Sequence, residues 1–164
     1  MNYALNDLRI NGSVLLHERY APPWAIDIPD EGALRAALSV ASDARVVPFH
    51  LVRHGAFDLH YDRQAPQRIY TNEVAICLSG ASHRMSFGNG AAAIPLARIL
   101  ENPAARTASS AAESTELICG VFQLRSAPLN PLLSALPKIL KVRTAGHDGD
   151  PLLRPAVALR GIEV

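Results

Sequence analysis

Between Phe49 and Phe87 the chain alternates short apolar runs with turn residues, and no other feature of the sequence limits the fold as strongly. Short strands at close spacing, with turns between them, are typical of an all-β barrel or sandwich and not of βαβ units. The strands predicted from this pattern are residues 49–53, 56–61, 69–71, 74–78 and 83–87.

Further strands and a few short helices are predicted on both sides of this stretch. Residues 24–28 alternate apolar with small or polar side chains, which is the period of a half-buried strand. The segment 91–114 is rich in Ala, Ser and Pro and is expected to be a long, mobile surface loop. The remaining expected elements are strands at 13–20 and 116–124, a helix at 4–10 stopped by Asn11-Gly12, a turn at 29–32, a short helix or inserted loop at 33–41, a helix at 96–100, and a short helix followed by an extended piece within 128–142.

The composition indicates one globular domain without a charge preference. The 164 residues are 49% hydrophobic and 19% charged, and the net charge at pH 7 is +1. This balance provides no electrostatic footprint for nucleic acid or for an anionic membrane. We find no apolar run that could span a bilayer and no signal peptide, so we expect a cytoplasmic protein. Residues 1–142 are assigned to one domain, and residues 143–164 to a tail or the start of a linker.

Two histidines and a cysteine on the predicted strands are the candidate metal ligands. Side chains alternate along a strand, so His50 shares a face with Val52, and His83 shares a face with Met85. If both faces point inward, the two imidazoles approach the barrel interior, where Cys119 can join them. Zinc accepts two His and one Cys as ligands, with one position left open. The alternative is a set of buried histidines that are hydrogen-bonded to their neighbours, beside a buried thiol.

The other polar residues of these strands offer no catalytic arrangement. At least one of His54 and His60 is expected to face solvent, and no Ser or Cys is fixed beside either of them by sequence. Arg53 and Arg84 alternate with the inward positions and are therefore expected on the outer face of the barrel. We assign no catalytic residue.

Two segments of the chain resemble the two motifs of the cupin superfamily. In the first motif a strand with an inward histidine ends in a glycine bend, as His50 and Gly55 do here. In the second motif a Gly-Asp pair starts a strand that ends in Pro-x-Gly-x-x-His, and Glu73, Gly80 and His83 match that pattern in part. The resemblance implies a cupin fold, which is a jelly-roll β-barrel with short peripheral helices.

The sequence also departs from the family pattern. Asn72 stands in place of the glycine of the second motif, Glu73 in place of its aspartate, and Leu78 in place of its proline. The full metal motif of the family has two histidines two positions apart and a glutamate before the bend. Val46 and Pro48 occupy that neighbourhood here. These departures argue against a metal-dependent cupin enzyme such as an isomerase or a dioxygenase.

Four segments in a fixed order carry a wider resemblance: Trp24 after a proline pair, Phe49-His50 before the bend, and residues 117–122 and 130–137. Together they are similar to the sensor domain at the amino end of many AraC-type transcription regulators. The resemblance covers roughly residues 5–142. In those regulators a helix-turn-helix domain follows, and this chain offers no segment long enough for one. We therefore expect DNA to be bound through a separate domain and not through this chain.

This resemblance implies a non-enzymatic domain that senses a small-molecule effector. Small barrels often keep a cavity for one ligand at the mouth. Zn²⁺ or another divalent metal at His50, His83 and Cys119 remains an open expectation, as does a homodimer formed through the apolar residues 129–140. The alternatives are a metal-dependent cupin enzyme and a stand-alone dimerisation module without a ligand. The expected pocket residues are Trp24, His50, His83, Met85 and Cys119.

Overall fold

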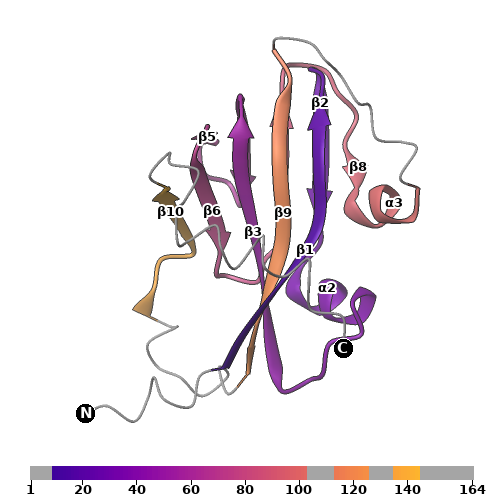
Figure 1. The fold of residues 1–164 in the computed structure, drawn as a ribbon, viewed down its shortest axis with the longest axis vertical. Helices are drawn as coiled ribbons and strands as arrows, with labels where there is room; N and C mark the ends of the chain where they lie inside the picture. Colours follow the sequence, from indigo (N-terminus) through magenta and orange to yellow (C-terminus); the bar gives the residue numbers. More distant parts are fainter. Residues whose placement is uncertain (1–8, 103–112, 126–134, 145–164) are drawn as a thin grey trace.

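Two five-stranded β-sheets face each other across an apolar interior (Figure 1). This computed structural model describes residues 9–102, 113–125 and 135–144. The first sheet contains, in spatial order, β1 (Arg9–Tyr20), β9 (Thr115–Arg125), β3 (Ala44–His54), β6 (Glu73–Cys77) and β10 (Ile139–Arg143). The second sheet contains β5 (Gln67–Tyr70), β4 (Ala56–Tyr61), β7 (His83–Phe87), β2 (Trp24–Ile28) and β8 (Ile94–Pro95).

Neighbouring strands are antiparallel except for β2 and β8. The all-β fold class predicted from the spacing of strands and turns is therefore confirmed. The predicted boundaries of β2, β4 and β7 are also correct, because each of these strands lies between clear turn residues.

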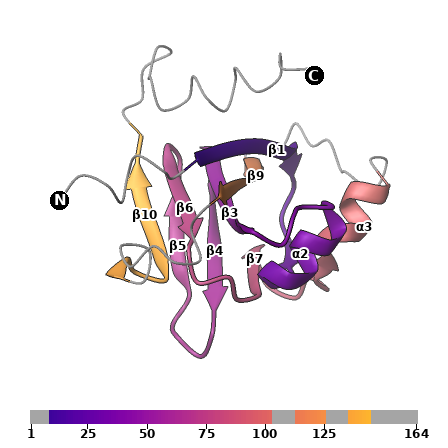
Figure 2. The same ribbon diagram turned by 90° about the horizontal axis from the view of Figure 1, so that it is seen from below.

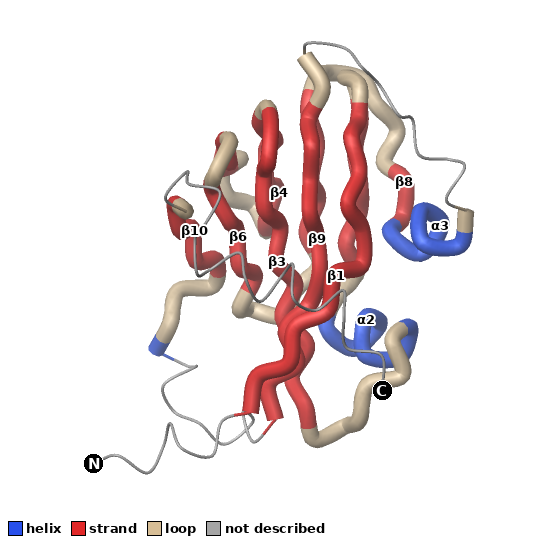
Figure 3. Tube along the Cα trace, in the orientation of Figure 1, coloured by secondary structure: helices blue, strands red, loops and turns tan. Residues whose placement is uncertain are grey.

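Two short helices lie on the side of the molecule away from β10 (Figure 2, Figure 3). Helix α2 (Glu31–Ala37) follows β2 and buries Leu34, and helix α3 (Leu96–Glu101) follows β8 and buries Leu96 and Ile99. Strand β2 ends before residue 29 as predicted, but the turn expected at 29–32 is limited to residues 29–30 because the Asp30 carboxylate accepts the Ala33 N–H at 2.9 Å and caps the start of α2. Among the helices that the structure describes, none has the length and apolar character to cross a membrane.

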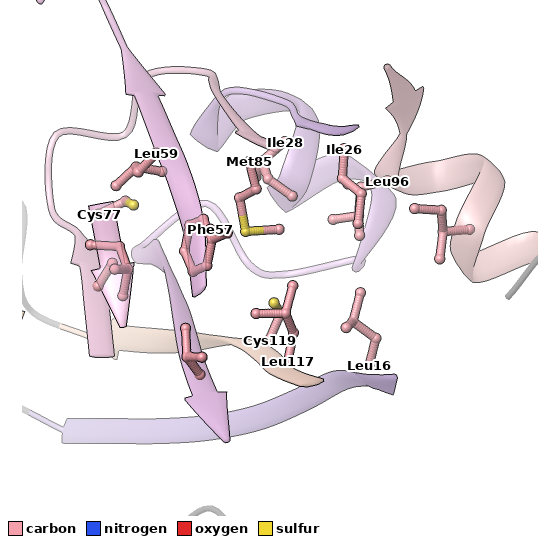
Figure 4. Packing of buried hydrophobic residues seen from close by; sticks show 14 of the residues in the cluster. Leu16, Ile26, Ile28, Phe57, Leu59, Cys77, Met85, Leu96, Leu117 and Cys119 are labelled. Atoms are coloured by element: carbon pink, nitrogen blue, oxygen red, sulfur yellow. The ribbon is translucent and has the colours of Figure 1, made fainter. Parts of the chain in front are cut away.

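Alternating side chains divide each strand into an inner and an outer face. In β4, Phe57, Leu59 and Tyr61 are buried, whereas Asp58 and His60 are only half-buried. This matches the predicted pattern and fixes the register, since a shift by one residue would turn the apolar set to solvent. Leu96 of α3 and inward side chains of both sheets fill the space between the sheets, and the inward side chains include Leu16, Ile26, Ile28, Phe57, Leu59, Cys77, Met85, Leu117 and Cys119 (Figure 4).

The first sheet extends further than the sequence predicts at two places. The expected stop at Asn11-Gly12 is wrong, because β1 begins at Arg9 and pairs with the end of β9. Tertiary pairing overrides the local helix preference there. Strand β3 begins at Ala44 and runs through Pro48, which pairs with β9. The pairing of β3 with β6 starts only at Phe49, so the missing N–H of Pro48 leaves no gap in that ladder.

Several predictions fall on chain segments that the structure does not describe. Residues 4–8 of the predicted first helix, residues 103–112 of the predicted loop and residues 145–164 of the predicted tail lie outside the described residues. The same holds for residues 128–134 of the predicted fourth helix, whereas β10 agrees with the extended piece expected after Pro137.

Candidate functional site

Three potential metal-ligand side chains converge in the core between the two sheets. His50 comes from β3 in the first sheet, and His83 comes from β7 in the second. Their Nε2 atoms lie 2.8 Å apart, and the Sγ atom of Cys77 lies 3.6 Å from His83 Nε2. The three donor atoms are all within 4.8 Å of one another, and all three side chains are buried. We call this set the His–Cys–His group.

The strand order explains why these three residues meet. Strand β3 pairs with β6 so that His50 lies opposite Ala75, and Cys77 is the next residue of β6 on the same face. The turn after β6 then brings the chain across to β7, which begins at His83. Gly80 makes this turn possible because its φ of +72° is a conformation that other residues rarely adopt.

The hydrogen bonds of His83 place a lone pair on its Nε2 atom. Its Nδ1 atom lies 3.3 Å from the carbonyl oxygen of Ala81, which can only accept, so Nδ1 carries the proton. In the bond between the two histidines, Nε2 of His50 must then donate, and Nδ1 of His50 becomes an acceptor. That Nδ1 atom is buried and has no partner among the described residues. The two histidines therefore do not satisfy each other's hydrogen-bonding capacity.

Burial keeps the three donors uncharged at neutral pH. It lowers the pKa of His83 to about 4 and lowers that of His50 well below its usual range, where the nearby His83 adds to the effect. Burial also raises the pKa of the Cys77 thiol to about 12. Neutral imidazole is the form that binds metals, and a bound cation would favour loss of the thiol proton.

This donor set fits a borderline-soft divalent cation such as Zn²⁺. Two imidazole nitrogens and a sulfur are ligands that zinc prefers over oxygen donors in many sites. A ligating histidine usually donates Nδ1–H to a backbone carbonyl and keeps a lone pair on Nε2, and His83 has that form. In the metal-free protein this lone pair accepts the Nε2–H of His50, so binding a cation through both Nε2 atoms requires the His50 proton to move to Nδ1. Tetrahedral zinc separates two ligand nitrogens by about 3.3 Å, so His50 and His83 would need to move apart by about 0.5 Å.

The structure brings together only part of the predicted metal set. His50 and His83 meet as the alternation of side chains predicts, but Cys77, and not Cys119, completes the His–Cys–His group. Cys119 is the strand partner of His50 on β9 and is buried. Burial raises the pKa of the Cys119 thiol, and the nearby Cys77 adds to the effect. Cys77 lies in the apolar run 74–78, and the sequence alone gives no strand register with which to place it beside His83.

The predicted pocket residues are packed in the core. Trp24 contacts the rings of Tyr20 and Phe57, with centroid distances of 5.4 Å and 6.3 Å, and Met85 is fully buried. A cavity beside His50 and Cys119 has a volume of about 10 Å³, which is near the smallest space that holds one water. Organic ligands usually occupy sites of about 300–1,000 Å³. Of the five predicted pocket residues, His50 and Cys119 line this small cavity, and His83 lines a larger space that opens to solvent.

A much larger depression lies on the opposite, solvent-facing side of the second sheet. This outer groove has a volume of about 860 Å³. On its floor, His60 Nε2 lies 2.8 Å from Ser86 Oγ, and Arg84 forms a bidentate ion pair with Asp27. The outer position expected for Arg84 is thus confirmed. Sequence reasoning missed the His60–Ser86 pair because the two residues are neighbours only through the pairing of β4 with β7.

Comparison with known proteins agrees with this architecture. A protein-family model described as "Cupin" matches residues 1–164, and no curated protein matches the sequence. The match covers the whole chain, including both strands that supply the histidines. Two facing sheets with few short helices, and a donor group held between them, are consistent with that match. The chain belongs to the cupin family.

Proposed function

We propose that this cupin domain is a non-enzymatic sensor module whose effector is a divalent cation of the Zn²⁺ class, bound by the His–Cys–His group. One observation carries the proposal: three buried donors, each uncharged at neutral pH, converge within 4.8 Å from three different strands. A second observation supports it: His50 Nδ1 is buried without a hydrogen-bond partner among the described residues, so a hydrogen-bond network alone does not explain why these donors are buried together.

The enclosure of the group favours sensing over catalysis. A catalytic metal keeps an open position next to a cavity that holds the substrate. Here His50 and Cys77 are each 1% exposed and His83 is 5% exposed, and the cavity beside His50 is about 10 Å³. The outer groove is lined by His83 but not by His50 or Cys77, so the group as a whole does not face a space of the size that a metal-dependent isomerase or dioxygenase needs for its substrate.

The position of the His–Cys–His group would allow a bound cation to change the arrangement of the neighbouring elements. Because the donors come from both sheets, a bound cation would link the two sheets. The turn between Cys77 and His83 is held from two sides: the Gly80 carbonyl accepts the Glu31 N–H at 2.8 Å, and Leu78 N–H donates to the Lys138 carbonyl at 2.8 Å. A shift of His83 therefore reaches both α2 and the residue that precedes β10. Binding acts as a signal only if the cation prefers one of two such arrangements.

The AraC-type resemblance supplies the context for this proposal. In that context the domain would act in the cytoplasm and control a DNA-reading domain outside the described residues. The net charge of +1 favours this division of labour, because so small a charge provides little electrostatic attraction to DNA.

The test is a metal titration of purified protein under reducing conditions. We expect about one equivalent of Zn²⁺ to bind and to raise the melting temperature, and Co²⁺ to give the visible absorption of a thiolate complex. His83→Ala and Cys77→Ser should each abolish the Co²⁺ spectrum. His17→Ala is the matched control, since His17 lies on β1 and pairs with Glu116 at the surface.

Three results would contradict the proposal. One is the absence of any Zn²⁺ binding by the wild-type protein. Another is an unchanged Co²⁺ spectrum in Cys77→Ser. The third is turnover of a substrate by the metal-loaded protein, which would favour a cupin enzyme in place of a sensor.

A further inference from the structure

The outer groove combines a polar floor with aliphatic walls. Its floor is the solvent face of β2, β4 and β7, and His83 of the His–Cys–His group lines one edge of it. We propose that this groove binds a monocarboxylic acid with an apolar body, whose carboxylate lies on Arg84 and the His60–Ser86 pair. The proposal is independent of the cation site.

Arg84 is a fixed cation with hydrogen-bonding capacity to spare. Its Nε and Nη2 atoms donate to the two carboxylate oxygens of Asp27 at 2.6 Å and 3.0 Å. Its Nη1 atom has no partner within the described part of the chain, and 52% of the side chain is exposed. The ion pair therefore orients the guanidinium before a ligand arrives. A planar guanidinium with open N–H groups is well suited to a carboxylate.

The His60–Ser86 pair also has one donor left. A neutral imidazole has one N–H and a serine has one O–H, and the 2.8 Å bond between them uses only one of the two. If the imidazole donates, the Ser86 hydroxyl can point to a ligand, and if the hydroxyl donates, the His60 Nδ1–H is open. His60 lies directly opposite Arg84 in the pairing of β4 with β7. Two donors therefore lie side by side on the floor, as the two oxygens of a carboxylate require.

The charges around the floor favour a monoanion. Asp27 is neutralised by Arg84, and Asp58 is neutralised by Arg68 through two bonds of 2.6 Å. The open donors thus face a region with no net charge from these two pairs. A single carboxylate can be accommodated there, whereas a dianion such as phosphate would lie close to two aspartates without enough cations to offset it.

The walls fit an apolar body and not a second polar group. They are formed by α2, by the start of α3 and by the segments that precede these helices. Small aliphatic side chains predominate on them, so they leave room along the groove and offer no further charge. The aliphatic lining residues are Ala25, Ile28, Pro29, Ala33, Ala37, Ala91, Pro95, Leu96 and Ala97, and the polar residues Ser82, His83 and Asn89 line the groove beside them.

The experiment compares acids with their uncharged amides by isothermal titration calorimetry, in the presence of EDTA so that the cation site does not contribute. The probes are octanoate and phenylacetate, with octanamide and phenylacetamide as matched controls. We expect an acid to bind at least about 10-fold more tightly than its amide. Arg84→Met should weaken acid binding by about 10- to 100-fold, because a charge-assisted hydrogen bond is lost. Ser86→Ala should weaken it by a smaller factor.

Two control variants distinguish a direct contact of Arg84 with the ligand from a change in the overall charge of the protein. Arg19→Met removes an exposed arginine that pairs with Glu116 on the first sheet and should leave binding unchanged. The double variant Asp27→Asn/Arg84→Met removes the pair without leaving an unpaired aspartate, and its binding should stay weak. Full recovery of binding in the double variant would overturn the proposal. Equal binding of acids and amides, or no binding of either acid at about 10 mM, would overturn it too.

Discussion

The two faces of β7 carry opposite kinds of polar site within five residues. On the inner face, His83 lies 2.8 Å from His50, and both are buried. On the outer face, Ser86 lies 2.8 Å from His60 at the floor of an open groove. Burial lowers the pKa of His83 to about 4, which keeps its ligating lone pair free of a proton. The His50–His83 and His60–Ser86 pairs have hydrogen bonds of the same length, so the two sites differ in burial and not in hydrogen-bond length.

This difference has a consequence for how the two sites can be altered. The inner site is made of core residues, so every change to it is also a change to packing. The outer site is attached to the sheet without being part of the core. We therefore expect the barrel to stay folded when its residues are substituted, which would allow the two proposals to be tested separately.

Replacing one histidine of each site by alanine should give the largest difference in stability between the inner and the outer face. We expect His50→Ala to lower the free energy of unfolding by about 2–4 kcal/mol, because a fully buried ring is removed and His83 loses its partner. His60→Ala should change it by less than about 1 kcal/mol, since His60 is only half-buried. Urea denaturation of both variants in EDTA measures this difference. Equal losses would mean that the groove floor is as much part of the core as the inner face.

Acid should destabilise the inner site before it affects the ion pairs. An unfolded histidine titrates near its ordinary pKa of 6.5, whereas folded His83 takes up a proton only near pH 4. Between these values the unfolded chain binds more protons, so the free energy of unfolding falls as the pH drops from about 6.5 to about 4. His83 alone contributes roughly 3 kcal/mol to this fall.

His83→Leu is the control for the pH dependence. It should make the free energy of unfolding of metal-free protein less dependent on pH between about 4 and 6.5. His54→Leu changes an exposed histidine at the end of β3 and should keep the wild-type slope. An unchanged slope in His83→Leu would show that His83 is already accessible to protons in the folded protein.

The sequence of each strand predicts which of its side chains share a face, but not which side chains of different strands meet. Alternation within a strand was sufficient to place His50, His83 and Arg84 on the correct faces, because the period of two is a property of each strand alone. Both cysteines lie on strands that flank β3, so the choice between them depended on which of the two approaches His83 in the facing sheet. Both cysteines are in apolar runs and both are buried, so burial could not separate them.

Contacts between strands explain the other missed features. The His60–Ser86 pair joins two strands that are separated by 21 residues of chain, from Tyr61 to His83, so no local motif marks it. The extension of β1 to Arg9 has the same cause, since its partner is the end of β9. Local patterns predicted which residues face inward, and the order of strands in the sheets decided which of those residues meet.

Gly80 lies in the turn that precedes the inner site, and Gly90 lines the outer groove, so alanine substitutions at the two glycines compare the two sites. Gly80 belongs to the turn that leads to His83, has a φ of +72°, and an added Cβ would lie 2.7 Å from a Glu31 carboxylate oxygen. Gly90 is at the rim of the groove, has a φ of +83°, and an added Cβ would meet nothing within 4 Å. We expect Gly80→Ala to lower the free energy of unfolding by about 2 kcal/mol and Gly90→Ala by about 1 kcal/mol.

The two glycine variants should also differ in their effect on the cation. Gly80→Ala shifts the turn that positions His83 and should weaken Zn²⁺ binding, whereas Gly90→Ala should leave it unchanged. Thermal melts with and without Zn²⁺ measure both quantities. Wild-type Zn²⁺ affinity in Gly80→Ala would mean that the turn does not position His83.

The smallest effect is expected for the ion pair on the groove floor. Asp27→Asn should change the free energy of unfolding by less than about 1 kcal/mol, because the Asp27 and Arg84 side chains are 42% and 52% exposed and water screens their attraction. Hydrogen bonds from Arg84 lower the pKa of Asp27, so the pair is charged at neutral pH and its small contribution should shrink further in about 1 M NaCl. Denaturation at low and high salt measures this. A loss of several kcal/mol, insensitive to salt, would mean that Asp27 and Arg84 hold the sheet together, and the outer face could then no longer be treated as separable from the core.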